Sequence, residues 1–368
     1  MGKSGGRFLK ALSYLGKQAE IHLCAICDIN SQNRPKKTYS DVPFFTDVEL
    51  FLSSIREVDI IILAVNDHEH YNVLCQIRES GVSIGRILSE KPLTATLKEA
   101  DQIACLFREN QISVNFVERF SPIVKDFLLW KRMIGGQIVR GEFFWGKNRC
   151  LDPRSTLGDL SEISHPIDLI NCFFEDEVTS VEIGTAFFSE SDFCPGHPYL
   201  LDSISAQMTI NGSVPINGHS SFVWEARRRR IILFVRSEVT NDLYQVSFDF
   251  DKVHWDIDSL VIHCFDTSSD ASTTRFITHQ RHVTHLEVPQ EIRKISKVYR
   301  FIEANLVNMH LLAGKVFESE LVFLSGAVRV QEILEKLRVR MSESVVLKTK
   351  LFNLTTAKLS SASNDING

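Results

Sequence analysis

The strongest constraint on the fold is an alternation of short β-rich runs with helical patterns along the first hundred residues. The runs "IHLCAICD", "VDIIILAV" and "GRILSEKP" are separated by the amphipathic stretches "DVELFLSSI" and "YNVLCQIRES". Such alternation predicts a parallel sheet covered by helices. Residues 60–65 are apolar at consecutive positions, which is typical of a central strand buried on both faces. The sequence therefore predicts an α/β domain of the Rossmann type.

A helix and one more strand complete this domain. Thr96 and Glu99 have the spacing of a capping box, which predicts a helix over residues 97–110. Residues 113–117 follow as a short strand. We therefore expect the domain to occupy residues 1–118.

Longer β-type segments follow, among them "QIVRGEFFW", "RIILFVRSEV" and "LYQVSFDF". Helical patterns are fewer, at "HPIDLINCFF", over residues 291–312 and over residues 318–337. Successive strands with few helices between them predict an α+β domain with an open, mainly antiparallel sheet. We expect this second domain over residues 119–340 and a polar C-terminal tail over residues 341–368.

Composition excludes several classes of protein. A chain of 368 residues is too long for one ordinary core, in agreement with two domains. The net charge of -5 gives no general attraction to nucleic acid or to an anionic membrane. No segment reaches the roughly 18 apolar residues of a membrane span. The eight cysteines are scattered and complete no zinc site, so we expect no metal and a reduced, cytoplasmic protein.

The first residues, "GKSGGRFLKAL", place glycines directly before a helical pattern. This is most of a dinucleotide-binding fingerprint: Gly2 would let the backbone approach a pyrophosphate, and Gly5 would let helix and strand pack closely. Lys3 and Ser4 lie between them. The first glycine and the first strand of the fingerprint are missing and would lie upstream of Met1. A start site placed too late and a decayed cofactor site both explain this, and "GKS" also allows the end of a phosphate-binding P-loop.

Asp28 ends the second expected strand, about twenty residues after the glycines. A carboxylate at this place accepts hydrogen bonds from the ribose hydroxyls of adenosine and repels a 2'-phosphate. No arginine follows before Arg34, so the sequence favours NAD over NADP. The alternative is an ordinary aspartate at a strand end.

Two further stretches carry candidate catalytic residues. Lys91 follows a strand and precedes Pro92, which places it at the carboxyl edge of the sheet, where open α/β folds bind ligands. Far along the chain, "GDLSEISHPIDLI" contains Glu162, His165 and Asp168 at three-residue spacing, on adjoining faces of a helix. In isolation each has a plainer explanation, a solvated lysine or a histidine bonded to backbone.

Together these stretches resemble a known family. "SEKPLT", "VERFSP" at residues 117–122 and "LSEISHPIDL" at residues 160–169 are similar to motifs of the glucose-fructose oxidoreductase and inositol dehydrogenase (Gfo/Idh/MocA) family. "AVNDHEH" resembles that family's ATPNxxH-type loop, with Asn66 where proline is usual. The likeness covers about residues 1–340.

The resemblance implies a Rossmann domain, an open-sheet α+β domain and hydride transfer between nicotinamide and a sugar-like or polyol alcohol. It implies that Lys91 is the motif lysine, His165 the catalytic histidine and Asp168 the aspartate three residues on. It further implies cofactor contacts, in addition to those above, from Ala64, Asn66, His70, Glu90 and Lys91.

The chain departs from the commonest family pattern at one position. That pattern has an aspartate four residues before the histidine, where this chain has Ser161. Glu162, one residue later, resembles a subgroup that carries Glu-Leu-Ser-His. Either Asp168 or Glu162 would therefore be the carboxylate that orients the imidazole.

The expected chemistry also follows from the residues themselves. Oxidation of a secondary alcohol requires removal of the hydroxyl proton, and histidine, with a pKa of about 6.5, is suited to this at neutral pH. Lys91 would hydrogen-bond the same oxygen and stabilise the alkoxide. This scheme needs no metal.

Other basic and aromatic residues are candidates for substrate contacts. Trp145, Lys147, Asn148 and Arg149 follow or end the "GEFFW" strand and form a candidate substrate loop. Arg119 either contacts substrate or pairs with Glu118 at the domain junction, the interpretation that we favour. The run of four arginines at residues 227–230 is interpreted as a solvated strand edge rather than as a phosphate clamp.

The sequence thus predicts an NAD-dependent oxidoreductase that acts on a CH-OH group of a sugar, nucleotide sugar or polyol. The alternative is a non-catalytic relative that binds a dinucleotide or sugar as a sensor or scaffold. We also expect a homo-oligomer, a dimer or tetramer, because an open sheet would otherwise expose a large apolar face.

Overall fold

The computed structural model describes residues 2–17, 19–35, 39–152, 156–175, 177–194, 199–252, 257–265, 276–284, 290–316 and 320–351. The helices in these residues are α1 (Lys3–Leu15), α2 (Val48–Ser53), α3 (His70–Glu79), α4 (Leu97–Leu106), α5 (Pro122–Met133), α6 (Asp159–Phe173), α7 (Ser296–Asn308) and α8 (Leu324–Glu343). The strands are β1 (Ile26–Cys27), β2 (Phe44–Phe45), β3 (Glu57–Leu63), β4 (Ser83–Glu90), β5 (Ile112–Asn115), β6 (Gly136–Asn148), β7 (Val181–Ser191), β8 (Leu200–Ile210), β9 (Val214–Ser221), β10 (Val223–Ser237), β11 (Leu243–Lys252), β12 (Ile257–Phe265), β13 (Phe276–Thr284) and β14 (Val346–Thr349).

The N-terminal part is a Rossmann-like domain whose parallel strands form two groups. Strands β3, β4 and β5 pair in parallel in the order β3-β4-β5, and the short β1 and β2 pair in parallel with each other. Within the described residues, no pairing joins β1 to β3, so β3 is an edge strand and not the central strand that residues 60–65 predicted. The predicted capping box is present: Thr96 accepts from the Glu99 amide, and Glu99 accepts from the Thr96 amide at 3.0 Å.

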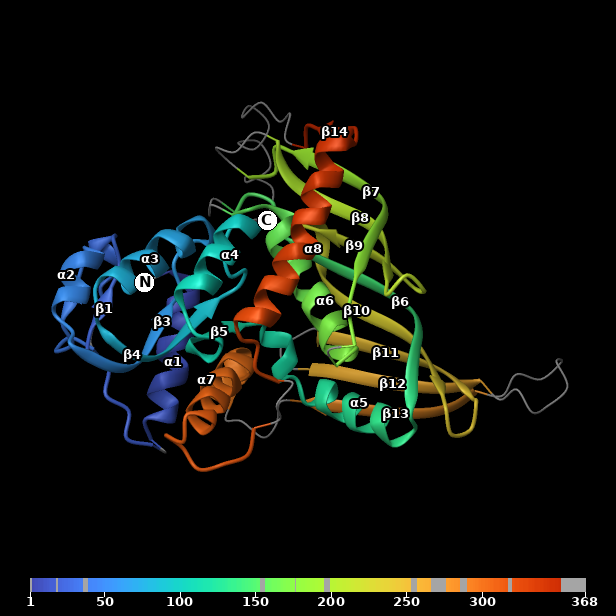
Figure 1. Cartoon of the computed structure of the whole chain (residues 1–368), viewed down its shortest axis with the longest axis horizontal. Coiled ribbons are helices and arrows are strands. Elements are labelled where there is room, and N and C mark those ends of the chain that lie inside the picture. Colours follow the sequence, from blue (N-terminus) through green and yellow to red (C-terminus); the bar gives the residue numbers. More distant parts are fainter. Residues whose placement is uncertain are drawn as a thin grey trace, which may run out of the picture.

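The second domain is built on one nine-stranded, mainly antiparallel sheet. Its order is β13-β12-β11-β10-β6-β9-β8-β7-β14, with parallel pairing only between β6 and β9 and between β14 and β7. Period-two burial along β10, where Ile231, Leu233 and Val235 are buried, gives the sheet an inner face. Helices α5, α6 and α8 pack on this face, toward the Rossmann-like domain (Figure 1). The predicted fold class is therefore confirmed.

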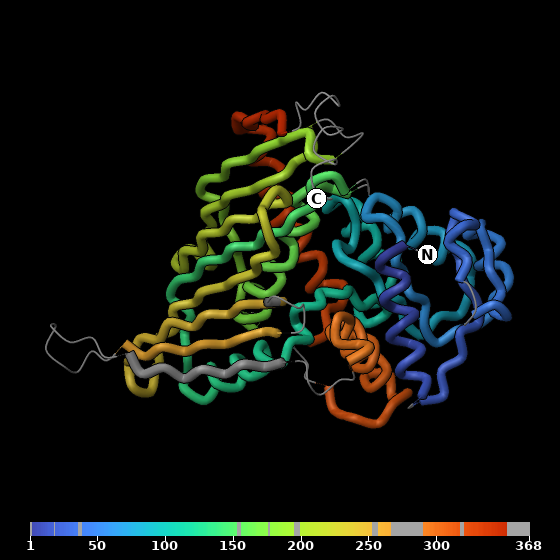
Figure 2. The backbone as a smooth tube through the Cα atoms, turned by 180° about the vertical axis from the view of Figure 1, so that it is seen from behind, coloured from blue at the N-terminus to red at the C-terminus, as the bar shows by residue number. Residues whose placement is uncertain are grey.

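Two C-terminal segments return to the first domain. Helix α7 packs along α1, with Phe301 against Phe8 and Tyr299 against Tyr14. Helix α8 packs on α4, and the Val322 carbonyl accepts from the Val114 amide of β5 at 2.8 Å. Figure 2 shows α7 beside α1 from the opposite side. The predicted boundary after residue 118 stays a prediction.

Several element bounds differ from the sequence analysis. Helix α8 begins at Leu324 and ends at Glu343, six residues later at each end than predicted, and β14 follows within the expected tail. Helix α7 is preceded by a 3-10 helix at Gln290–Ile295. From residue 352 onward, the tail lies outside the described residues.

Candidate active site

The glycine-rich start forms the beginning of α1 rather than a loop. Gly2 is the N-cap in an extended conformation, and the helix continues through Gly5 from Lys3. The Ser4 hydroxyl donates to the Glu90 carboxylate at the end of β4. The start of α1, with its free amide groups, therefore lies at the carboxyl edge of the sheet, immediately beside Lys91.

Asp28 follows β1 directly. Its carboxylate accepts from the Asn30 amide at 2.9 Å and from the Asn33 side chain at 3.1 Å to each oxygen. These bonds fix the carboxylate at the strand end, the place from which a ribose would be bound.

The loop after β3 supports the strand that carries Lys91. The ring of His70 is buried, and its Nδ1 lies 2.8 Å from the Pro92 carbonyl oxygen. Asn66 caps the 3-10 helix at Asp67–Glu69 by accepting from the His68 amide. Ala64 packs against the apolar cluster of α1 and α7.

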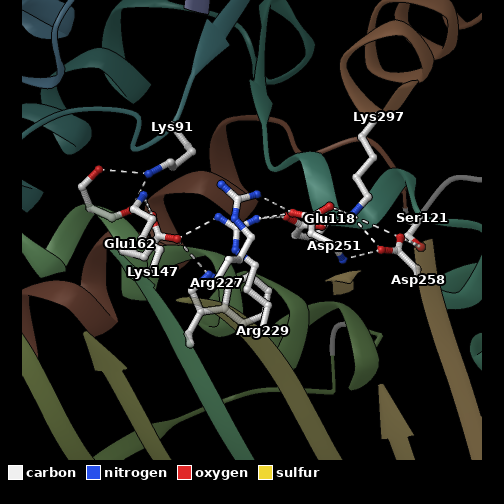
Figure 3. Close-up of polar contacts among 12 residues, drawn as sticks. Lys91, Glu118, Ser121, Lys147, Glu162, Arg227, Arg229, Asp251, Asp258 and Lys297 are labelled. Atoms are coloured by element: carbon white, nitrogen blue, oxygen red, sulfur yellow. Dashed lines mark hydrogen bonds and ion pairs between the residues drawn. The ribbon is translucent and has the colours of Figure 1, made fainter. Parts of the chain in front are cut away.

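Lys91 lies directly after β4 and points toward the first turn of α6. Its ammonium donates to the Ser161 hydroxyl at 2.9 Å and to the Ser161 carbonyl at 2.5 Å. No carboxylate among the described residues forms an ion pair with Lys91. Within the described part of the chain, the lysine charge at this edge is therefore bound by the two neutral oxygens of Ser161. Figure 3 shows Lys91 on the same side of the site as Glu162 and Lys147.

His165 lies one turn after Ser161 on α6 and is 6% exposed. Its ring stacks on Trp145 of β6 at 6.0 Å, and its buried Nδ1 has no hydrogen-bond partner in the described part of the chain. Burial lowers the pKa of His165 well below its ordinary value, and nearby Lys91 lowers it further. The ring is neutral at neutral pH and can accept a proton.

Glu162 is held by three donors. One carboxylate oxygen accepts from the Trp145 indole at 3.1 Å and from Arg229 at 2.8 Å, and the other accepts from Lys147. Burial alone would raise the pKa of Glu162, but Lys147 and Arg229 outweigh burial and hold it well below the ordinary value. Glu162 is thus a fixed negative charge beside His165.

Asp168 and Arg119 bind each other. The guanidinium donates to both carboxylate oxygens, at 2.8 Å and 2.7 Å. In the described residues no hydrogen bond joins Asp168 to His165. No hydrogen bond joins Glu162 to His165 there either, but the charge of Glu162 acts to raise the pKa of His165. Arg119 has a carboxylate partner on α6 in place of the favoured Glu118.

The residues of the candidate substrate loop differ in their burial and in their contacts. Trp145 is fully buried, whereas Lys147 remains one-fifth exposed over the ring of Phe222. Burial lowers the pKa of Lys147 to about 7, although Glu162 opposes this. Arg149 stacks on the same ring, 4.9 Å from its centre, and pairs with Asp152.

The arginine run is not a solvated strand edge, so that interpretation was wrong. Arg229 is 6% exposed and binds Glu118, Glu162 and Asp251. Arg227 also pairs with Asp251. Lys297 of α7 binds Glu118, Asp251 and Asp258 on the far side of this cluster (Figure 3).

The residues at the carboxyl edge fit a dinucleotide better than a metal. The start of α1, Glu90 and the strand-end Asp28 have the donor and acceptor types that a pyrophosphate and a ribose need. Within the described residues, no group of three or more histidine, cysteine or acidic side chains could hold a metal ion, and no helix there is long and apolar enough to cross a bilayer.

The fold and the site together define a protein of two domains. The first is Rossmann-like, and the second is built on an open, mainly antiparallel sheet. Residues 1–116 match the Gfo/Idh/MocA family model, described as an oxidoreductase family with an NAD-binding Rossmann fold. The resemblance inferred from the motifs is thereby confirmed for the N-terminal part of the chain. A search of curated proteins finds no match.

Solved structures share the architecture over nearly the whole chain. The UDP-N-acetylglucosamine 3-dehydrogenase GnnA from Acidithiobacillus ferrooxidans is 20% identical, with a TM-score of 0.62 over 91% of this chain and 93% of that one. A levoglucosan dehydrogenase in complex with NADH and L-sorbose is 16% identical, with a TM-score of 0.67 over 93% and 95%. A super-repressor mutant of Gal80p from Saccharomyces cerevisiae is 16% identical, with a TM-score of 0.66 over 94% of each chain. At these identities the likeness establishes the fold.

Proposed function

We propose that this protein is an NAD(H)-dependent oxidoreductase that acts on a secondary alcohol of a sugar, nucleotide sugar or polyol. One observation carries the proposal: Lys91, without a carboxylate partner in the described residues, points at the turn of α6 from which the neutral His165 follows. A cation and a proton acceptor at the carboxyl edge of a Rossmann-like sheet are the two groups that alcohol oxidation needs.

In this mechanism His165 takes the proton of the substrate hydroxyl. Lys91 donates a hydrogen bond to the same oxygen and stabilises the negative charge that develops there. Glu162 lies beside the ring and stabilises the imidazolium that forms. The nicotinamide supplies the hydride acceptor or donor.

The first domain would hold the cofactor. Gly2, Lys3, Ser4 and Gly5 at the start of α1 would bind the pyrophosphate, and Asp28 would accept from the adenosine ribose, which favours NAD over NADP. Residues of the loop after β3 and the end of β4 would line the nicotinamide side, namely Ala64, Asn66, His70 and Glu90.

The substrate class is supported by two kinds of observation. The dehydrogenases of similar fold are named for a nucleotide sugar and an anhydrosugar. The chain also places two cationic hydrogen-bond donors near the site, Lys147 and Arg149, which pack over the buried ring of Phe222. Such donors suit the hydroxyl oxygens of a sugar.

A second candidate is a binding protein without catalysis. The separation of β1 and β2 from β3, β4 and β5 favours it, because the edge that faces the cofactor is interrupted. The shared fold with a Gal80p repressor also supports it.

Calorimetric titration of NADH and then NADPH into the full chain tests the cofactor proposal. We expect NADH to bind in the micromolar range and NADPH more weakly. Nicotinamide absorbance with UDP-N-acetylglucosamine, levoglucosan and inositols then tests turnover. Binding without turnover on any sugar favours the binding protein. No binding of either nucleotide contradicts the oxidoreductase and leaves a sugar-binding protein as the remaining candidate.

A cytoplasmic homo-oligomer remains part of the proposal. The outer face of the nine-stranded sheet has no helix over it in the described residues, and Figure 2 shows its strands in front of the helices. Phe187 on this face is 72% exposed, beside a hollow of about 500 Å³. Light scattering of the purified chain measures the mass, and a monomer at micromolar concentration would contradict the oligomer.

A further inference from the structure

Arg229 makes more contacts with the candidate site than the sequence suggested. It lies on the inner face of β10, in register with Trp145 of β6. One terminal nitrogen donates to Glu162 at 2.8 Å, and the other donates to Glu118 and to Asp251 at 2.8 Å. Its guanidinium also lies over the Trp145 ring, 5.0 Å from the ring centre.

Two sets of contacts therefore connect Arg229 with His165. The first passes through Glu162, the negative charge beside the imidazole. The second passes through Trp145, whose indole donates to the same Glu162 oxygen and whose ring stacks on His165. A planar guanidinium can donate in two directions and stack at the same time, whereas an ammonium offers only a point charge.

The opposite end of Arg229 is fixed by residues outside the site. Glu118 belongs to the 3-10 helix at Val117–Phe120, where the chain leaves the first domain, and Asp251 belongs to β11. Both also bind Lys297 at the start of α7, the helix that packs along α1. Figure 3 shows this row of alternating charges running from Lys147 to Asp258.

We propose that Arg229 is the positioning residue of the candidate site, which holds Glu162 and Trp145 in the geometry that fixes the ring of His165. The catalytic meaning of this inference rests on the proposed function. The positioning itself can be measured without turnover.

The charged groups that face His165 come from four elements. They are Lys91 after β4, Lys147 of β6, Arg229 of β10 and Glu162, one turn earlier on α6. Replacement of Arg229 removes a cation and releases Glu162 and Trp145 from one side, so the environment of His165 changes in both charge and packing.

The experiment is an NMR titration of the full chain labelled at the histidine ring carbons. The His165 signal is the one that His165→Gln removes. In Arg229→Met we expect the His165 midpoint to rise by about one pH unit, because one nearby cation no longer opposes the imidazolium. Arg228→Met is the matched control, since it also removes a cation and Arg228 faces the outer side of the same strand over Phe144. A folded Arg229→Met with an unchanged His165 midpoint and shift would overturn the proposal.

Arg229→Lys keeps the test decisive if the methionine variant does not fold. Its single ammonium is drawn to the two carboxylates Glu118 and Asp251 and leaves Glu162, so the His165 midpoint should fall between those of wild type and Arg229→Met. A wild-type titration in Arg229→Lys would mean that any cation suffices, and positioning would be refuted.

Kinetics add a readout once a substrate turns over. We expect Arg229→Lys to lower kcat about tenfold or more with little change in KM, and to cause no further loss in a Glu162→Gln background, because the arginine acts through Glu162. If no sugar is oxidised, the proposed function fails while the NMR result still decides the positioning.

Discussion

Lys91 donates a 2.9 Å hydrogen bond to the hydroxyl of Ser161, the residue four positions before His165. The serine stands where the commonest pattern of the resembled family has an aspartate. This contact shows that position 161 faces the lysine. Lys91, the candidate cation, is thus bound by the neutral oxygens of Ser161. The carboxylate of this turn belongs to Glu162, one residue further along α6.

Ser161→Asp should supply the missing ion pair. A carboxylate next to Lys91 offsets one of the cations that disfavour imidazolium, so we expect the His165 midpoint to rise by about one pH unit. The ring-carbon NMR titration measures it. Ser161→Asn is the matched control without charge, and equal midpoints in the two variants would contradict the prediction.

Lys91→Met and His165→Gln should each reduce turnover about a hundredfold or more, because each removes one group that acts on the reacting oxygen. NADH binding should remain nearly unchanged, since the start of α1 and Asp28 are intact. Steady-state rates and calorimetric titration on the same preparations test both points. Normal turnover in either variant would refute that residue's assignment.

Lys147 should make stability depend on pH. Its folded pKa of about 7 lies below the value of about 10.4 for an unfolded lysine. Between these values the unfolded chain holds a proton that the folded chain does not. The free energy of unfolding of wild type relative to Lys147→Met should therefore rise with pH, by at most about 1.4 kcal/mol per pH unit.

Urea titrations of wild type and Lys147→Met from pH 7 to about pH 10 measure this difference. Lys98→Met, on the exposed side of α4, is a control that should show no such slope. A constant difference between wild type and Lys147→Met would contradict the lowered pKa.

Gly158 should be needed to begin α6. Its φ of 69° favours glycine, and an added Cβ would lie 2.5 Å from the Leu201 carbonyl oxygen. We expect Gly158→Ala to lower the free energy of unfolding by about 3 kcal/mol or more. Gly212→Ala, at a φ of 67° but in open space, should cost only about 1 kcal/mol. Equal losses in urea titrations would show that the contact with Leu201 has no effect.

Asp28→Asn should weaken the preference for NADH. Loss of the carboxylate removes the repulsion of a 2'-phosphate, so NADPH affinity should rise about fivefold, a typical effect of one exposed charge pair. Calorimetry with both nucleotides measures the ratio. An unchanged ratio would place the adenosine ribose away from β1.

The fold was predictable because its signals are local. Apolar runs, the Thr96–Glu99 capping box and the change from short to long strands each lie within about ten residues. The candidate pair of Lys91 and His165 was predictable for the same reason, since each sits in a short motif. For Asp168 the local signal was misleading. Helical spacing predicted that it lies near His165, but its carboxylate binds Arg119, from the 3-10 helix before α5.

The buried charges were missed because their partners are distant in sequence. Arg229 is 111 residues from Glu118, and Lys297 is 179 residues from the same glutamate. Arg229 is in phase with the buried Ile231, Leu233 and Val235 of β10, but residues 231–235 are apolar at every position, so no alternation in the sequence marked the buried face.

The return of α7 to the first domain sets an order for synthesis on the ribosome. Phe8, Leu15 and Leu88 share an apolar cluster with residues from Ile292 to Leu306, which are made almost at the end of the chain. A nascent chain that has reached only β6 therefore leaves this face of α1 and β4 in water. The first domain can therefore bury this face only after α7 has been synthesised, and until then its folding stays incomplete.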